Sequence, residues 1–473
     1  MNQTSSSVLP EKGSLVYFTT VCVVAALGRF LFGYDTAVVS GTNAFVKAQF
    51  QLGPLMEGWI VSSALVGCVI GSGAAGWLSD RFGRKTVLVL SAFLFVFTSL
   101  GCAFAPGPQL LAMARLIGGL GVGVAGMVAP LYIAEISPPH IRGRMISVYQ
   151  FAITIGILVA YFANALFQHL HETPLFETSG GLYHWMIVEE VWRGMFVSLL
   201  FPAGLFFVLA LGVPESPRWL TKQGEEDRAL GILARVTGAA EARREMAEIR
   251  ETIAHEAGDF RQLFRPGIRA ALIMAVFLAC AAQLSGINAV IYYGPKILET
   301  AGFKISNALG GQVILGIVNV LFTVLAMWQV DKMGRRPLLF VGNLGVFCSL
   351  VAIGAFFAQG VVGGYWLIAF LCTYLACFAF SLGPLPWVFM AEVFPTRVRG
   401  RAMSVAVLCL WAANTVVCQT FPWLSDPANL GPARTCWIYA AMVFPVFLFV
   451  WKFMPETKGR SLEELEKYFS HSG

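Results

Sequence analysis

Twelve apolar stretches, each long enough to cross a lipid bilayer, dominate this chain of 473 residues. A membrane-spanning helix needs about twenty mainly apolar residues. The first six stretches are separated from the last six by a polar segment. They lie at roughly 14–36, 57–78, 87–105, 109–133, 145–167, 191–213, 268–295, 308–330, 337–358, 363–391, 401–422 and 434–454. The sequence therefore predicts an all-α membrane protein with twelve transmembrane helices.

The composition and the placement of charge support a membrane location. Charged residues make up 13% of the chain, about half the 25% that is usual for a soluble domain. The net charge of +6 does not indicate a nucleic-acid partner, because about 24 of the 33 Lys and Arg residues fall in alternate connections between the stretches. Such an excess marks cytoplasmic loops. We expect a multi-pass protein of the cell (inner) membrane with both termini in the cytoplasm.

Three short motifs occur once in each half of the chain, at spacings near 240 to 257 residues. The pairs are 80–85 with 331–336, 134–144 with 391–401, and 214–218 with 455–458. Because each motif keeps its place relative to the spans, the halves are predicted to run parallel in the membrane. We expect four parts: a six-helix bundle at 1–213, a small cytoplasmic helical linker domain at 214–267, a second six-helix bundle at 268–454, and a cytoplasmic tail at 455–473.

The repeated motifs carry carboxylates and arginines at the predicted inner rim of both bundles. The residues are Asp80, Arg84, Glu135, Arg142, Asp331, Arg335, Glu392 and Arg399. We expect them to form a gating charge network that joins the bundles when the cavity faces outward and separates when it opens inward. An exposed ion pair contributes only about 0–1 kcal/mol, which still biases two states of similar free energy. The alternative is that these charges only set the topology.

A set of motifs spread over nearly the whole chain resembles one family. The matching residues are Gly76 with 80–85, Arg115 with Gly118 and Gly119, Glu135 with 142–144, 214–218, 283–288, Gly383 and Pro384 with Trp387, and 455–459. In this order they resemble the sugar porter family of the major facilitator superfamily, its bacterial proton symporters more than its animal facilitators. The resemblance implies the major facilitator fold and alternating-access import of a monosaccharide or related polyol (hexose, pentose or cyclitol).

Polar and aromatic side chains inside the spans form the predicted solute site. Intramembrane polar residues are costly and therefore point to function, and neutral amides can both donate to and accept from sugar hydroxyls. The predicted substrate-binding residues are Gln150, Gln283, Asn288, Asn319, Trp387, Phe32, Phe378, Asn414 and Tyr293. The resemblance places Gln150, Gln283, Asn288, Asn319 and Trp387 in the sugar pocket. The alternative is that the amides bond neighbouring helices.

Two departures from the family pattern leave the solute's identity open. Ala282 stands where the family has a second Gln, and Leu410 stands where relatives often carry an amide. Each lost amide removes a hydrogen bond of about 1 kcal/mol, so a different ring, a deoxy sugar, a polyol or a cyclitol is conceivable. Gly383, Pro384 and Pro386 in the tenth span, and Ser285 with Gly286 in the seventh, are expected to break the helices and act as gating hinges.

Asp35 and Arg115 are the predicted proton-coupling pair. They lie at similar depth in the first and fourth spans, and a buried carboxylate needs a partner. Proton-coupled relatives carry Asp at this position, whereas passive facilitators commonly carry Asn. Arg29 precedes Asp35 by six residues, about 240° around the helix, where the family has a small residue. It either pairs with a carboxylate that the sequence does not identify or binds an anionic solute.

Two alternatives to proton-coupled transport remain at this point. The chain could be an uncoupled sugar facilitator or a transporter-like nutrient sensor. No nucleophile–base set or phosphate-binding loop indicates an enzyme. We expect no metal site, no cofactor apart from the coupling proton, and no nucleic-acid partner. The expected partners are the small-molecule solute and the lipid bilayer, and the expected state is a monomer.

Overall fold

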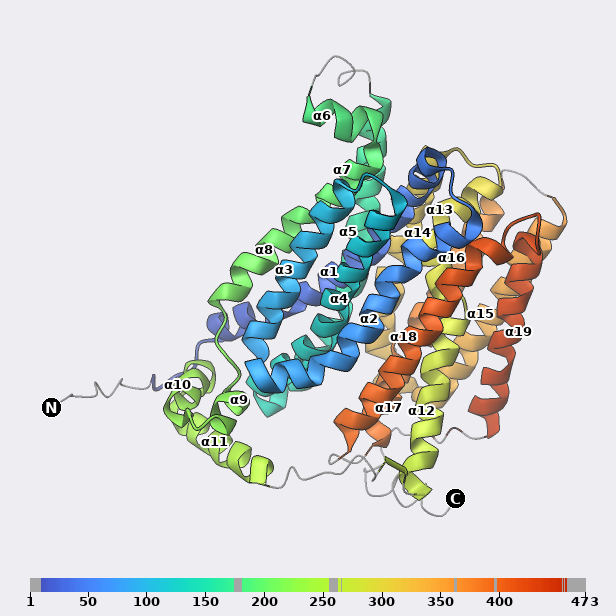
Figure 1. The fold of residues 1–473 in the computed structure, drawn as a ribbon. Coiled ribbons are helices and arrows are strands. Elements are labelled where there is room, and N and C mark those ends of the chain that lie inside the picture. The colour runs from blue at the N-terminus through green and yellow to red at the C-terminus, as the bar shows by residue number, and fades with distance from the viewer. Residues whose placement is uncertain are drawn as a thin grey trace.

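The computed structural model contains helices and connecting turns but no strands in the residues that it describes, which are 10–173, 181–254, 263–264, 266–360, 364–394, 398–452, 454 and 456. Twelve helical segments in this part are long and apolar enough to cross a membrane. They stand roughly side by side in two groups (Figure 1). The all-α fold class and its twelve spans are confirmed.

The N-terminal bundle contains seven helices that make six spans. They are α1 (Leu15–Phe50), α2 (Pro54–Phe82), α3 (Arg84–Ala103), α4 (Pro108–Ile136), α5 (Pro139–Glu172), and the sixth span formed by α7 (Val191–Ser198) with α8 (Leu200–Gly212). A short α6 (Leu182–His184) and a π-helix, η2 (Trp185–Glu189), lie between α5 and α7. The first span runs much further than the apolar stretch at 14–36, because its second half buries polar residues such as Thr36 and Ser40 inside the protein.

The C-terminal bundle has the same order of spans, two of which are broken. Its helices are α12 (Pro266–Leu284) with α13 (Ile287–Thr300), α14 (Ile305–Met333), α15 (Arg335–Ala358), α16 (Tyr365–Phe380) with α17 (Leu385–Val393), α18 (Arg399–Leu424) and α19 (Gly431–Lys452). Helix α2 packs against α18, and α5 packs against α14. Since second and eighth spans correspond, as do fifth and eleventh, these two contacts are related by the same pseudo-two-fold axis that relates the bundles.

Small residues let the helices of one bundle approach closely. A Cβ added to Gly119 of α4 would lie 1.9 Å from the carbonyl oxygen of Ala64 in α2, and one added to Gly67 of α2 would lie 2.1 Å from that of Leu116. Such contacts exclude any larger side chain at these crossings. In lipid, the burial of apolar surface does not favour helix association. Membrane helices therefore usually associate by close packing through small residues.

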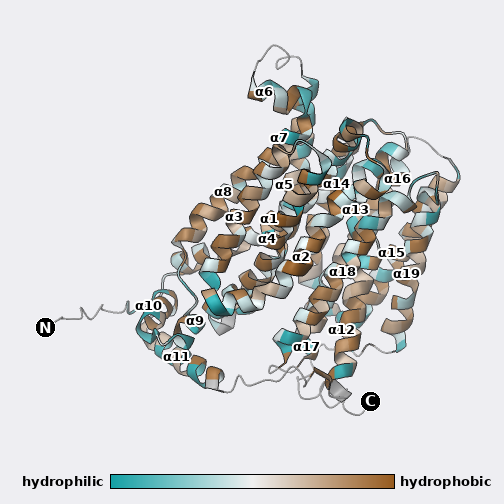
Figure 2. Cartoon of the chain, in the orientation of Figure 1, coloured by the Kyte–Doolittle hydropathy of each residue, from teal (hydrophilic) through white to brown (hydrophobic). Residues whose placement is uncertain are grey.

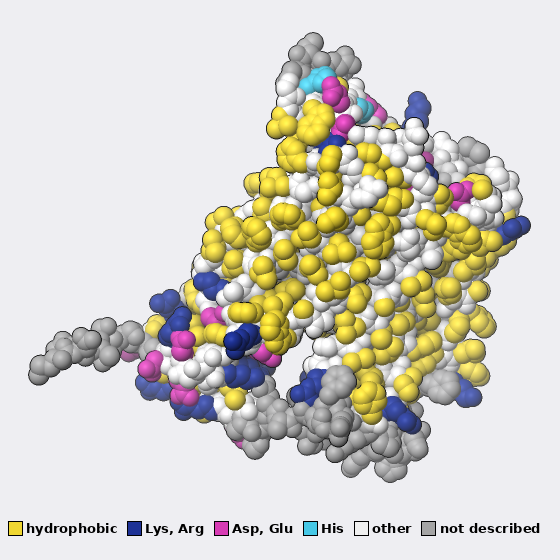
Figure 3. Space-filling model, viewed as in Figure 1, with side chains coloured by type: hydrophobic (Ala, Val, Ile, Leu, Met, Phe, Trp, Pro, Cys, Tyr) yellow, Lys and Arg dark blue, Asp and Glu magenta, His cyan; other side chains and the backbone are white. Residues whose placement is uncertain are grey.

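Large apolar side chains cover the outside of both bundles, as the band of hydrophobic residues in Figures 2 and 3 shows. Trp77 is 67% exposed and Phe201 is 80% exposed. A soluble monomer rarely exposes an apolar surface of this extent. Charged side chains gather instead at the end of the molecule that carries α9–α11 (Figure 3), which we call the linker end.

The linker domain consists of α9 (Pro217–Lys222), α10 (Glu226–Thr237) and α11 (Ala239–Ala254). These helices enclose a small apolar core of their own, which includes Leu220, Leu233 and Met246. The indole of Trp219 donates to the carbonyl of Asp80 at 2.9 Å. The linker is therefore attached to the N-terminal bundle.

Candidate functional site

The seventh span is interrupted where two of the predicted solute residues meet. Helix α12 ends at Leu284 and α13 begins at Ile287, because Gly286 adopts the left-handed conformation at φ +84°. Across this break the Asn288 amide donates to the Gln283 side-chain oxygen at 2.5 Å. The break therefore turns the two amides toward each other, with one donor and one acceptor already matched.

Gly286→Ala is expected to distort this break. The left-handed conformation disfavours any residue with a Cβ by roughly 1–2 kcal/mol, and the new Cβ would lie 2.9 Å from the Tyr439 ring. We expect a loss of about 2 kcal/mol or more in stability, with uptake reduced further because Gln283 and Asn288 are displaced. Thermal unfolding and uptake by the purified, reconstituted variant measure both effects.

Gly310→Ala is the matched control, because Gly310 lies in α14 with nothing within 4 Å of an added Cβ. It should keep both wild-type stability and wild-type uptake. Equal stability and uptake in Gly286→Ala would contradict the proposed importance of the break.

The tenth span is broken in a similar way beside the aromatic residues. Helix α16 ends at Phe380 and α17 begins at Leu385, so Gly383 and Pro384 lie in the break. The Gly383 amide donates back to the Phe378 carbonyl at 2.9 Å. The predicted break is present, and it leaves Phe378 and Trp387 on either side of it. Its role as a hinge stays a prediction.

Aromatic side chains from both bundles converge near the middle of the molecule. Phe32 of α1 meets Trp411 of α18 in an edge-on contact, with ring centroids 5.3 Å apart. The Arg29 guanidinium lies 5.1 Å from the centroid of the Phe32 ring and 5.9 Å from that of Trp387. The structure thus brings the predicted Phe32 and Trp387 to one place together with Trp411 and Arg29.

Seven of the nine predicted solute residues are only partly buried although they lie within spans: Gln150, Gln283, Asn288, Asn319, Trp387, Phe32 and Phe378. Partly exposed amides at this depth face either lipid or an internal space, and amides that face lipid are unfavourable. Figure 3 shows the surface hollowed between the two bundles at the linker end. These residues are therefore consistent with a cavity that opens toward that end.

Two other predicted solute residues are enclosed by the C-terminal bundle. Tyr293 is fully buried, donates to the Cys418 carbonyl at 3.0 Å and stacks on Phe421. Asn414 is also buried, and its side-chain oxygen accepts a bond from the Cys418 thiol at 3.2 Å. In this conformation both residues stabilise helix packing, so contact with a solute would require a rearrangement.

Asp35 and Arg115 form a buried ion pair. An Arg115 guanidinium nitrogen donates to an Asp35 carboxylate oxygen at 2.9 Å, and both side chains are almost completely enclosed. Two further nitrogens of Arg115, Nε and Nη2, have no hydrogen-bond partner among the described residues. Removing one charge of a buried pair leaves the other charge uncompensated. A proton that neutralised Asp35 would therefore leave the charge of Arg115 uncompensated. The coupling role of the pair stays a prediction.

The gating charge residues form matched clusters, one in each bundle. Arg84 makes two bonds of 3.0 Å to Glu135, and Arg335 bonds Glu392 at 2.7 Å. The likeness extends to the backbone, since Arg84 and Arg335 each also donate to a carbonyl five residues earlier. Glu215 and Glu456 likewise accept from the backbone amides of Arg84 and Arg335.

Three other members of the network make contacts within their own bundle. Asp80 contacts Arg84 at 3.1 Å, while Arg142 and Arg399 donate to the carbonyls of Ser137 and Phe394. The side chain of Asp331 lies outside the described residues. Each of these contacts lies within one bundle, and the gating role of the network stays a prediction.

The end opposite the linker is closed by polar contacts between the bundles that the sequence reasoning missed. The Glu57 carboxylate of α2 contacts Lys296 of α13 at 2.6 Å and Lys47 of α1 at 3.1 Å. Ser40 donates to Gln312 at 2.8 Å. The opposite charges of Glu57 and Lys296 at the ends of two spans were a signal, but nothing in the sequence says which spans meet.

Further polar contacts reinforce this closure. The pairs are Asn43 with the Tyr292 carbonyl, Ser62 with Gln419, Tyr161 with the Ile291 carbonyl, and Gln419 with the Leu55 carbonyl. Each of them joins a helix of one bundle to a helix of the other. Closed at one end and hollowed at the other, the molecule is in a state that opens toward the linker end.

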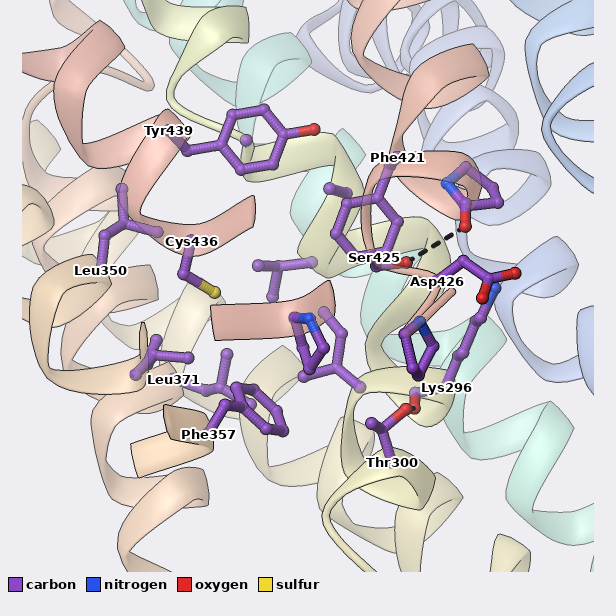
Figure 4. A pocket seen from close by; sticks show the side chains of 18 of the residues that line it. Lys296, Thr300, Leu350, Phe357, Leu371, Phe421, Ser425, Asp426, Cys436 and Tyr439 are labelled. Carbon is purple, nitrogen blue, oxygen red and sulfur yellow. Dashed lines mark hydrogen bonds between the residues drawn. The ribbon is translucent and has the colours of Figure 1, made fainter. Parts of the chain in front are cut away.

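A separate cavity of about 270 Å³ is lined mainly by residues of the C-terminal bundle, together with Lys47 of α1. Its walls are mostly apolar, and Lys296 and Asp426 stand at one side of it (Figure 4). None of the predicted solute residues lines it. It is therefore distinct from the space between the bundles.

Two parallel bundles of six spans with a closable central space define a membrane transporter. The chain belongs to the sugar (and other) transporter family, whose model matches residues 21–469. It is 39% identical to the arabinose-proton symporter of Bacillus subtilis over 455 residues, covering 96% of this chain and 95% of that protein. It is also 39% identical to the D-xylose-proton symporter of Escherichia coli, covering 95% of each.

A solved structure has the same fold. The xylose transporter of Escherichia coli in its inward-open conformation matches with a TM-score of 0.81 and 36% sequence identity, over 95% of this chain and 99% of that one. Family membership makes the chain a transporter rather than an enzyme.

Proposed function

We propose that this protein is a proton-coupled symporter that imports a monosaccharide or related polyol by alternating access. The observation that carries the proposal is the buried ion pair of Asp35 with Arg115, 2.9 Å apart, in a transporter of this family. A carboxylate can take up and release one proton per cycle, which an amide cannot. The names of the two symporter relatives support the same chemistry.

The solute site is the space between the bundles, bounded by the partly buried amides and the aromatic residues of both bundles. Gln283 and Asn288 supply donors and acceptors for hydroxyls, and Phe32 and Trp387 offer flat faces to the apolar side of a ring. The breaks at Gly286 and Gly383 let parts of the seventh and tenth spans move while the rest of each bundle stays rigid. The matched arginine clusters meet across the bundles when this space faces outward.

The orientation follows from the charges. The linker end carries most of the arginines and lysines, so it faces the cytoplasm together with both termini. The protein is a monomer of the inner membrane. Its parts are the bundles 1–213 and 268–454, the linker 214–267 and the tail 455–473, of which the last lies outside the described residues apart from Glu456.

Uptake into proteoliposomes tests the proposal. Labelled pentoses, hexoses, polyols and cyclitols are offered with an inward pH gradient, without one, and with a protonophore present. We expect accumulation of at least one of them only with the gradient. Equal, gradient-independent equilibration would show an uncoupled facilitator, and no movement of any saccharide or polyol would overturn the proposal.

A further inference from the structure

Arg29 places a positive charge among the predicted solute residues, and the proton-coupling pair does not account for it. The side chain is 92% buried, since only 8% of it is exposed. Its guanidinium carbon lies 5.1 Å from the Phe32 ring centroid, 5.5 Å from that of Tyr149 and 5.9 Å from that of Trp387. These rings come from α1, α5 and α17, so the charge lies between the bundles.

No carboxylate neutralises Arg29 among the described residues. The recorded ion pairs do not include it, and its Nε has no hydrogen-bond partner there. Its polar neighbour is the Tyr149 hydroxyl, which is uncharged. The carboxylate that lies nearest along the helix, Asp35, is engaged by Arg115. The middle of the N-terminal bundle therefore holds two guanidinium groups and one carboxylate, a surplus of one positive charge.

Buried charges in proteins are normally paired, and intramembrane charges normally mark a substrate or ion pathway. Aromatic faces stabilise a cation in part, but they leave its N–H groups without acceptors. An arginine fork has the geometry to bind a carboxylate through two parallel hydrogen bonds. The Nε of Arg29, which has no partner among the described residues, is thus available as one donor of such a pair.

We propose that the solute of this transporter is a sugar acid, a ring with several hydroxyls and one carboxylate such as a hexuronate, and that Arg29 binds its carboxylate. This inference rests on the proposed function, because the hydroxyls and the ring are held by Gln283, Asn288 and the aromatic residues. A single surplus charge matches a monoanion rather than a doubly charged sugar phosphate.

The proposal changes the electrical balance of transport. One proton carried on Asp35 together with one monoanion moves no net charge across the membrane. Uptake is then driven by the pH gradient and is insensitive to the membrane potential. A neutral sugar carried with one proton would move a positive charge and would respond to the potential.

Matched pairs of ligands test the proposal on the purified full-length protein. Calorimetry measures binding of D-glucuronate against D-glucose and of D-galacturonate against D-galactose, at pH 7 and constant ionic strength. We expect the acid of at least one pair to bind about tenfold or more tightly than the neutral sugar, the factor typical of one charge-assisted hydrogen-bond pair. Uptake of that acid should not change when a potassium and valinomycin potential is applied.

Variants of Arg29 separate binding from packing. Arg29→Gly should lose the preference for the acid while keeping or improving binding of the neutral sugar. Arg29→Lys should keep part of the preference, because the charge remains and the fork is lost. Thermal unfolding at a temperature comparable to that of the wild type shows that the variants are folded. The comparison of acid with neutral sugar on the wild type does not depend on any variant.

The outcomes distinguish this inference from the proposed function. If the wild type binds and transports the neutral sugar as well as or better than the acid, the sugar-acid inference is overturned and the symporter proposal stands. If Arg29→Gly weakens both ligands equally, Arg29 only holds the bundles together and the inference is likewise overturned. If neither the acids nor the neutral sugars are bound, the sugar-acid inference is overturned, and the proposed function fails only if the wider panel of pentoses, polyols and cyclitols is not moved either.

Discussion

Asp35→Asn should abolish uptake against a gradient while leaving exchange of solute across the membrane intact. Asparagine keeps the size and the hydrogen-bond acceptor of Asp35 but has no titratable group. The variant therefore mimics a permanently protonated carboxyl, and the Arg115 contact at 2.9 Å loses its charge attraction. The carrier can still turn over with solute bound, but no proton is released inside to make the cycle directional.

The size of the expected loss follows from the driving forces. One pH unit provides a tenfold accumulation for one coupled proton. For a neutral solute, a membrane potential of 100 mV adds about 2.3 kcal/mol, or roughly fiftyfold. In Asp35→Asn the accumulation ratio should fall to one under either force. If the solute is a sugar acid carried with one proton, the wild type should show only the tenfold accumulation per pH unit, without the contribution of the membrane potential.

The measurement compares two assays on the same proteoliposomes. Counterflow of labelled solute should run at a rate close to that of the wild type, whereas uptake driven by a pH gradient should stop at equilibrium. Asp227→Asn is a suitable control, because this carboxylate lies in α10 of the linker domain and is exposed. Concentrative uptake by Asp35→Asn that matched the wild type would rule out Asp35 as the coupling group.

Glu57→Gln should open the end of the molecule that lies opposite the linker. The Glu57 side chain is only 3% exposed and bonds both Lys296 and Lys47, so it joins the two bundles through charge. Glutamine removes that charge and breaks the ion pairs with Lys296 and Lys47. The coupling free energy between two distant sites of a protein is typically about 1–3 kcal/mol, which is 5- to 150-fold in an equilibrium constant. We expect Glu57→Gln to shift the population by this order toward the state that is open at the end opposite the linker.

Distances between spin labels report this shift. In a background without native cysteines, labels at Leu55 in α2 and Trp423 in α18 report on both bundles, because both side chains are exposed. Glu57→Gln should populate longer distances than its parent. Glu189→Gln is the control, since Glu189 lies at the same end and contacts His184 within its own segment. A distance distribution identical to that of the parent would contradict a gating role for Glu57.

Predictions made from local patterns were accurate for the spans. The twelve apolar stretches correspond to the twelve candidate spans, because whether a segment is apolar enough for lipid depends on that segment alone. Boundaries failed where polar residues continue a helix inside the protein. The first span was predicted to end near residue 36, yet α1 continues to Phe50.

Site residues were predictable in kind but not in arrangement. The amides of Gln283 and Asn288 stand out as polar groups in an apolar stretch, yet only the left-handed Gly286 makes them bond each other. Asn414 was also a candidate in the sequence, and the structure shows its amide engaged with its own helix. Hydropathy does not distinguish these two situations, because it does not record where a side chain points.

The sequence by itself determined the number of spans, the duplication of the bundles and the charged residues of each repeat. These properties are local or periodic, and lipid imposes the same requirement on every segment. Only the tertiary structure decided that Glu57 meets Lys296 across the bundles and that Arg29 lies among three aromatic rings, with no carboxylate paired to it in the part of the chain that the structure describes. Such contacts depend on which helices cross and at what depth, and these are set by packing between segments that are far apart in the chain.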